Sequence, residues 1–156
     1  VAAKHGYHFD TAQMPLNLMD AHFRSFARLV VPRLVREGTA VLGMKSLCGG
    51  EGILLKTGAV TATECIHYAL NLPTATVICG IDKQEVLDQA FTVAKSFKLM
   101  SEAQVEALLK KTQALAGDGQ YELFKTTAHF DATAKHADWL GEDPPSAKKL
   151  TPSPTG

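Results

Sequence analysis

The sequence predicts an α/β protein built from parallel strand–helix repeats, and three observations support this fold class. The segments 39–45 and 74–80 are almost entirely apolar, as in strands that are buried in a parallel sheet. Amphipathic segments with apolar residues at helical spacing alternate with them. Capping signals stand before several of these helices. Strict alternation of strand and helix implies a parallel sheet, whose functional groups gather at the carboxyl ends of its strands.

The length and composition limit the possible classes of protein. The 156 residues suffice for one domain, and 46% hydrophobic and 21% charged residues are typical of a globular one. Sixteen basic residues balance sixteen acidic ones, which argues against a general nucleic-acid binder. No apolar run approaches the ~20 residues of a membrane span, and no secretory signal is visible. The chain begins at Val1 without an initiator Met, so we expect the natural sequence to extend upstream.

The first third of the chain contains the following predicted elements: a strand at 9–17, a helix at 20–31, a short helix at 32–37, a strand at 39–45 and a loop at 46–52. Asn17 or Asp20 can cap the first helix, because both side chains accept hydrogen bonds from free N–H groups. Pro32 suits the first turn of the second helix, and Gly38 can end it.

The remaining elements are predicted as a helix from 62 to about 70, a strand at 74–80, a helix to about 94, a short strand at 97–99 and a helix at 102–116. Capping-box spacing occurs at 61–64, 82–85 and 101–104. The segment 142–156 holds four of the seven prolines and is expected to be a disordered tail. Four strands fit half of an eight-stranded barrel and also a small open sheet, and periodicity does not separate the two.

Three predicted strand ends, 13–17, 44–47 and 79–83, should meet on one rim. At the last of them, Gly80 allows close approach of a ligand, and Lys83 lies where a helix begins and can add a charge for a phosphate. The alternative is an ordinary strand-to-helix turn capped by Asp82. Lys45 at the second strand end can bind an anion, form a Schiff base if desolvated, or simply be solvated. The glycine-rich loop 49–52 can fold over a ligand or serve as a linker.

Cysteine and histidine patterns point away from disulfide and metal chemistry. Cys48, Cys65 and Cys79 are an odd number without a CxxC pair, so we expect reduced thiols in a cytoplasmic protein. The six histidines show no HExxH or similar ligand spacing, and His67 is expected to pack within a helix. No GxSxG motif supports a hydrolase.

The strand ends together resemble the second half of an aldo/keto reductase. The matching stretches are 9–20, 41–47, 68–70 and 76–81. The segments 121–126 and 130–141 resemble a bacterial subgroup of that superfamily. The resemblance implies a (β/α)8 TIM barrel that binds NADP(H) in extended form and reduces carbonyls. Residues 1–141 would then be the C-terminal half of that barrel with a C-terminal extension, holding strands five to eight.

The resemblance also implies the roles of individual residues. Gln13 falls where the family contacts the nicotinamide amide, and Met44 falls where many members place a Tyr under the ring. The residues that fall on the pyrophosphate segment are Lys45, Ser46 and Leu47, and those on the 2′-phosphate loop are Gly80, Ile81, Asp82 and Lys83. Val86, Gln89 and Ala90 stand where the family often has an Arg and a Glu-Asn pair, so the choice between NADP and NAD stays open. Of these three, Gln89 is expected to contact the cofactor.

The function implied by the resemblance is that of an oxidoreductase that transfers a hydride between NADP(H) and a small carbonyl or alcohol substrate. The family's Asp, Tyr, Lys and His tetrad belongs to strands that precede Val1, so no residue here is assigned as catalytic and the chain alone is expected to be inactive. The alternatives are a Schiff-base aldolase or lyase that uses Lys45, and a non-catalytic half-barrel that binds a nucleotide or a protein.

A half-barrel also predicts association. It leaves unpaired strand edges at 9–14 and 97–99 and inward-facing residues, such as Val41, Met44, Val77 and Ile78, without an opposite layer. We therefore expect self-association or a need for the N-terminal half-barrel as partner.

Overall fold

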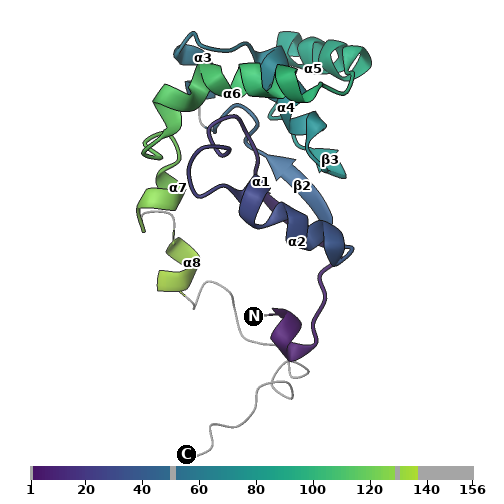
Figure 1. Ribbon diagram of the computed structural model, residues 1–156, viewed down its shortest axis with the longest axis vertical. Coiled ribbons are helices and arrows are strands. Elements are labelled where there is room, and N and C mark those ends of the chain that lie inside the picture. The colour runs from purple at the N-terminus through teal and green to yellow at the C-terminus, as the bar shows by residue number, and fades with distance from the viewer. Residues whose placement is uncertain (1, 50–51, 129–130, 137–156) are drawn as a thin grey trace, which may run out of the picture.

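The computed structural model describes residues 2–49, 52–128 and 131–136, which form a mixed α/β fold (Figure 1). Three strands, β1 (Thr11–Pro15), β2 (Ala40–Met44) and β3 (Thr76–Val77), form an open parallel sheet in the order β1-β2-β3. The helices are η1 (Ala2–His5, a 3-10 helix), α1 (Phe26–Leu29), α2 (Val31–Arg36), α3 (Ile53–Lys56), α4 (Ala62–Asn71), α5 (Gln84–Ser96), α6 (Glu102–Ala116), α7 (Leu123–Thr126) and α8 (Ala132–Lys135). The α/β class and the parallel sheet are as predicted.

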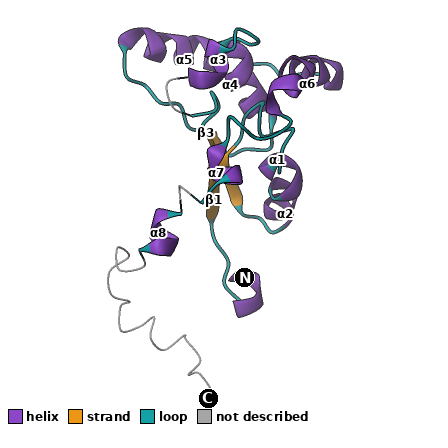
Figure 2. Cartoon of the chain, turned by 90° about the vertical axis from the view of Figure 1, so that its left-hand side faces the viewer, coloured by secondary structure: helices purple, strands orange, loops and turns teal. Residues whose placement is uncertain are grey.

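One face of the sheet is covered by helices. Met14 of β1 and Val41 of β2 point to this face and are buried against residues of α1 and α2. In both views α1 and α2 lie together on one side of the strands (Figures 1 and 2). Side chains alternate along a strand, so the neighbouring positions point to the opposite face. There Gln13 is exposed, and Leu42 and Met44 are only half-buried.

A second core joins the loop after β1 to the helices near the carboxyl ends of the strands. Leu18 and Met19 of that loop are buried with residues of α4 and α6, among them Cys65 and Leu108. Figure 1 shows α3, α4, α5 and α6 grouped at this end, opposite the N-terminus. The loops that follow the strands therefore lie against a packed helical layer.

Local capping chemistry explains where several helices begin and end. The predicted capping boxes of α4, with Thr61, and of α6, with Ser101, are both present. Pro32 lies in the first turn of α2, and Gly38 ends it with a φ of +73°. These features depend on residues three or four positions apart, which is why the sequence predicts them well.

The segment 20–25 is not helical, although the sequence pattern predicts a helix from residue 20. The Asp20 side chain accepts hydrogen bonds from the backbone N–H groups of Phe26 and Ala27, at 2.9 and 3.1 Å. It therefore caps the helix from six and seven residues away, and α1 begins only at Phe26, with Ser25 as its N-cap.

Other elements differ from the prediction for related reasons. The capping box predicted at 82–85 is absent, because α5 begins one residue later, with Lys83 as an N-cap that makes no side-chain hydrogen bond. The segment 97–99 is not a strand, since Phe97 packs edge-on against the His67 ring with centroids 5.6 Å apart. The third strand, β3, is shorter than predicted. Because 97–99 forms no strand, the edges of the described sheet are β1 and β3.

The predicted inward-facing residues are only partly correct. Val41 lies on the helix-covered face, and Val77, paired with Gly43, shares that face by register. The predicted tail at 142–156 lies outside the described residues. None of the described helices is long and apolar enough to cross a membrane.

Candidate functional site

A cavity of about 870 Å³ lies at the carboxyl ends of the strands, between the loops that follow β2 and β3 and the first turns of α5. All ten residues that the resemblance implies for cofactor binding line it: Gln13, Met44, Lys45, Ser46, Leu47, Gly80, Ile81, Asp82, Lys83 and Gln89. They come from four stretches of the chain that only the fold brings together. The volume lies within the range of small-molecule and cofactor sites in proteins.

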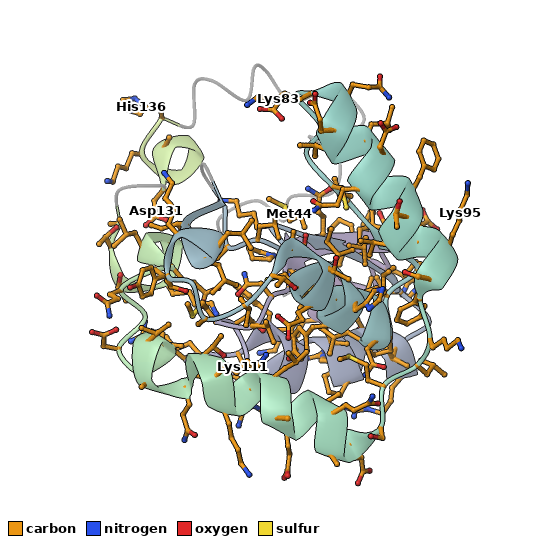
Figure 3. The ribbon with its side chains drawn as sticks, turned by 90° about the horizontal axis from the view of Figure 1, so that it is seen from above. Met44, Lys83, Lys95, Lys111, Asp131 and His136 are labelled. Carbon is orange, nitrogen blue, oxygen red and sulfur yellow. The ribbon has the colours of Figure 1, made fainter. Side chains whose placement is uncertain are left out.

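Gln13 and Met44 reach the cavity from β1 and β2. The Gln13 side-chain amide donates to the Met44 sulfur, with Nε2 and Sδ 2.9 Å apart. A thioether is a weak acceptor, so a stronger acceptor on a ligand can replace it without a large loss. Met44 lies near the centre of the molecule when the structure is viewed from above (Figure 3).

A tight turn from Lys45 to Cys48 forms the next wall of the cavity. The Cys48 N–H donates to the Lys45 carbonyl at 2.8 Å, and both residues have positive φ angles, 53° and 66°. Such angles are uncommon for residues other than glycine. The Lys45 ammonium lies over the Phe124 ring, 5.1 Å from its centre, and the side chain is exposed.

The segment 80–83 forms an exposed rim that leads into α5. An added Cβ at Gly80 would meet nothing within 4 Å, so the backbone there is open to close approach. Lys83 has extended backbone and makes no side-chain cap, and the first N–H groups of α5 follow it. Figure 3 shows Lys83 at the start of α5 and Lys95 near its other end.

The three thiols differ in access. Cys79 is half-buried and lines the cavity, whereas Cys48 and Cys65 are buried. Burial raises the pKa of Cys48 and of Cys65 to about 12, and burial also raises the pKa of Cys79.

A buried charge network next to the cavity is not predicted by the sequence. Lys125 Nζ lies 2.6 Å from Asp20 Oδ1 and 2.7 Å from Glu122 Oε2, and it also donates to the Phe23 carbonyl at 2.9 Å. All three charged side chains are at most 3% exposed. Burial raises the pKa of Glu122, and the hydrogen bond from Lys125 opposes this effect. The signal in the sequence is the Glu-x-x-Lys spacing at 122–125, in which Tyr121 precedes Glu122 and Phe124 precedes Lys125.

The described residues include no group of three or more His, Cys, Asp or Glu side chains that could hold a metal ion. His67 packs as predicted, with Nε2 lying 3.2 Å from the Val93 carbonyl oxygen and the ring against Phe97. The polar groups that line the cavity include the Gln13 amide, the Ser46 hydroxyl, the Cys79 thiol, the Asp82 carboxylate and the ammonium groups of Lys45 and Lys83.

Comparisons of the chain with protein-family models, curated proteins and solved structures found no significant match. The fold and the site define a mixed α/β protein with a cavity at the carboxyl ends of a parallel sheet.

Proposed function

We propose that this chain is the cofactor-binding half of an aldo/keto reductase-type oxidoreductase and that it binds NADP(H) in the cavity at the strand ends. The observation that carries the proposal is that residues 13, 44–47, 80–83 and 89 line a single cavity. The resemblance points to these residues from their order and spacing along the chain. The strand ends of a parallel sheet share one rim, and the cavity joins them to Gln89 of α5.

The arrangement of the helices supports the half-barrel. Right-handed crossovers between strands in sequential order place their helices on one face of a sheet, as on the outside of a (β/α)8 barrel. Here the order is β1-β2-β3, and α1, α2 and Leu72 at the end of α4 contact one face. A doubly wound sheet reverses its strand order and places helices on both faces. Gln13 and Met44 lie on the face that would line a barrel interior.

The residues of the cavity fit an anionic dinucleotide. Lys45 and Lys83 line it and can offset phosphate charge, and the Gln13 amide can bind a carboxamide; the lining also includes the Asp82 carboxylate. A bound nicotinamide supplies the hydride to a carbonyl carbon or accepts it from an alcohol. The residues of this chain bind and orient it, and none of them is assigned as the proton donor. We therefore expect no steady NADPH oxidation by this chain alone with a carbonyl substrate.

Calorimetric titration with NADPH tests the proposal on the wild-type chain and on two lysine variants. Lys83→Ala removes one charge-assisted phosphate contact and should weaken binding about tenfold or more, since such a contact contributes roughly 1.5–3 kcal/mol. Lys95→Ala, on the same helix but outside the cavity, is the matched control and should leave the affinity unchanged. Equal affinities for all three proteins, or no binding by wild type, would overturn the proposal. The same titration with NADH decides the cofactor preference.

The Schiff-base alternative has no structural observation in its favour. An amine nucleophile of this kind is activated by desolvation or a neighbouring cation, and the Lys45 side chain is exposed beside an aromatic ring. Borohydride reduction in the presence of a carbonyl compound, followed by mass spectrometry, would trap an adduct on Lys45 if the alternative were true. We expect no such adduct.

A further inference from the structure

The segment 121–125 contacts the turn at residues 45–48 at both ends of the turn. The Lys45 ammonium lies over the Phe124 ring, and the Cys48 thiol lies 3.4 Å from the Tyr121 carbonyl oxygen, to which it can donate. The two segments are more than seventy positions apart in the sequence. Their contact places the C-terminal part of the described chain against the wall of the cavity.

The Asn17 side chain hydrogen-bonds to both of these segments. It is 1% exposed, and its Nδ2 donates to the Lys45 carbonyl at 3.2 Å and to Glu122 Oε1 at 3.4 Å. Its Oδ1 accepts two backbone N–H bonds from the residues that follow it. A buried amide that uses both of its ends has one orientation, so Asn17 fixes the position of the Lys45 carbonyl. That carbonyl is also the acceptor that closes the turn through the Cys48 N–H.

The buried ion pairs anchor the segment 121–125 itself. Lys125 is held between Asp20 and Glu122, and Asp20 is held in turn by the Ser25 hydroxyl and the first N–H groups of α1. Charges buried in this way keep their geometry, because separation leaves an uncompensated charge. The segment is therefore a fixed support for what it touches.

We propose that residues 121–125 and Asn17 are a positioning element for the cavity, acting on Lys45, Ser46 and Leu47 through the turn at 45–48. The turn needs such support because Lys45 and Cys48 both have positive φ angles, which persist only where the surroundings hold them. Phe124 also contacts the Lys45 ammonium, which lies over its ring. The proposal rests on the proposed function only for the identity of the ligand.

Backbone amide exchange in an Asn17→Asp variant tests the support without any ligand. This substitution replaces the Asn17 side-chain nitrogen, which donates to the Lys45 carbonyl, by an oxygen. It keeps the side-chain oxygen that accepts from the Met19 and Asp20 N–H groups. Asn71→Asp is the matched control, because Asn71 is half-buried and accepts from the Met100 N–H through its oxygen. We expect exchange at the Cys48 amide to accelerate at least tenfold more in Asn17→Asp than exchange at Tyr68 in α4. Equal acceleration at both amides would show a merely global loss of stability and overturn the proposal.

A second variant, Phe124→Leu, keeps Asp20, Glu122 and Lys125 and provides the same comparison if Asn17→Asp does not fold. It removes the ring that the ammonium groups of both Lys45 and Lys125 contact. Leu123→Ala is its control, since Leu123 is 50% exposed on the same short helix. We expect Phe124→Leu to accelerate Cys48 exchange and to weaken NADPH binding severalfold, and Leu123→Ala to do neither. Unchanged Cys48 exchange in Phe124→Leu would contradict the support. Absence of NADPH binding by wild type would remove the proposed function, while the exchange comparison would still decide this inference.

Discussion

The Glu122 carboxyl is buried beside a second carboxyl, that of Asp20. Asp20 and Glu122 share a single cation, Lys125, and the Asp20 carboxylate accepts three further hydrogen bonds. Burial therefore raises the pKa of Glu122 above its ordinary value of 4.5, although Lys125 offsets part of the effect. Because the folded chain binds this proton more tightly than the unfolded chain, Glu122 contributes stability at low pH that is lost as pH rises through its folded pKa.

A Glu122→Gln variant should reveal this dependence. The amide keeps the volume and leaves Lys125 paired with Asp20 alone. We expect the free energy of unfolding of the variant, relative to wild type, to be most favourable at pH 7 and to decline toward pH 5. Urea unfolding at pH 5, 6 and 7 measures the trend, with exposed Glu102→Gln as the control for the chemical change. A relative stability that rises toward pH 5 would be contrary to this expectation.

The accessibility of the thiols predicts their reactivity. We expect one thiol, Cys79, to react with a disulfide reagent in the native chain, and all three to react in urea, because Cys48 and Cys65 are buried. Cys79→Ser should abolish the native reaction. NADPH should slow it, since Cys79 lines the cavity. A native reaction of two or three thiols would show that the core opens readily.

The sequence predicts where the candidate site residues lie, but it does not predict the network that supports them. The positions of Gln13, Lys45 and Gly80 at strand ends follow from local patterns, since parallel strands share one rim. The contacts of Asn17 and Asp20 with the segment 122–125 span about a hundred residues, and no periodicity reports such a pairing. The charges of Glu122 and Lys125 would ordinarily indicate a solvated surface.

Thr61 and Glu64 form a capping box at the start of α4. Thr61 Oγ1 accepts from the Glu64 N–H at 3.2 Å, and the Glu64 carboxylate accepts from the Thr61 N–H at 2.8 Å. Thr61→Ala should therefore reduce the free energy of unfolding by about 1 kcal/mol. Asp82→Ala should cost less than about 0.5 kcal/mol, because α5 begins after Lys83 and Asp82 does not cap it. Equal losses in urea unfolding would indicate that Asp82 caps α5 in solution.

The sequence predicts a helix or strand correctly where interactions between neighbouring residues determine it. The capping boxes of α4 and α6 and the Gly38 stop act within one helical turn, and the sequence places them correctly. The helix predicted over 20–25 is wrong because the bonds from Asp20 to Phe26 and Ala27 replace a helical turn. The strand predicted at 97–99 is wrong because Phe97 packs against His67 of α4 instead of pairing with the sheet.

The molecule as a whole has a parallel sheet with unequal faces. Purely parallel sheets usually have both faces covered. Here Gln13, Leu42 and Met44 lie on the less buried face, and β1 and β3 each have one unpaired side in the described sheet. Next to β3, Ile78 and Ile81 are 40% and 49% exposed. Unpaired strand sides and exposed apolar residues both favour association.

We therefore expect the 156-residue chain to dimerise or aggregate in solution, as measured by light scattering, and to bind a hydrophobic dye. A Lys at a sheet edge opposes pairing with another chain, so Ile78→Lys should shift the population toward monomer. Leu29→Lys changes a side chain that is 72% exposed on α1, which covers one face of the sheet, and should leave the population unchanged. A monodisperse wild-type monomer with a cooperative melt and no dye binding would instead mean that the described helices suffice for an open sheet. That result would count against the half-barrel, because a sheet that is stable as a monomer does not need a second half to cover it.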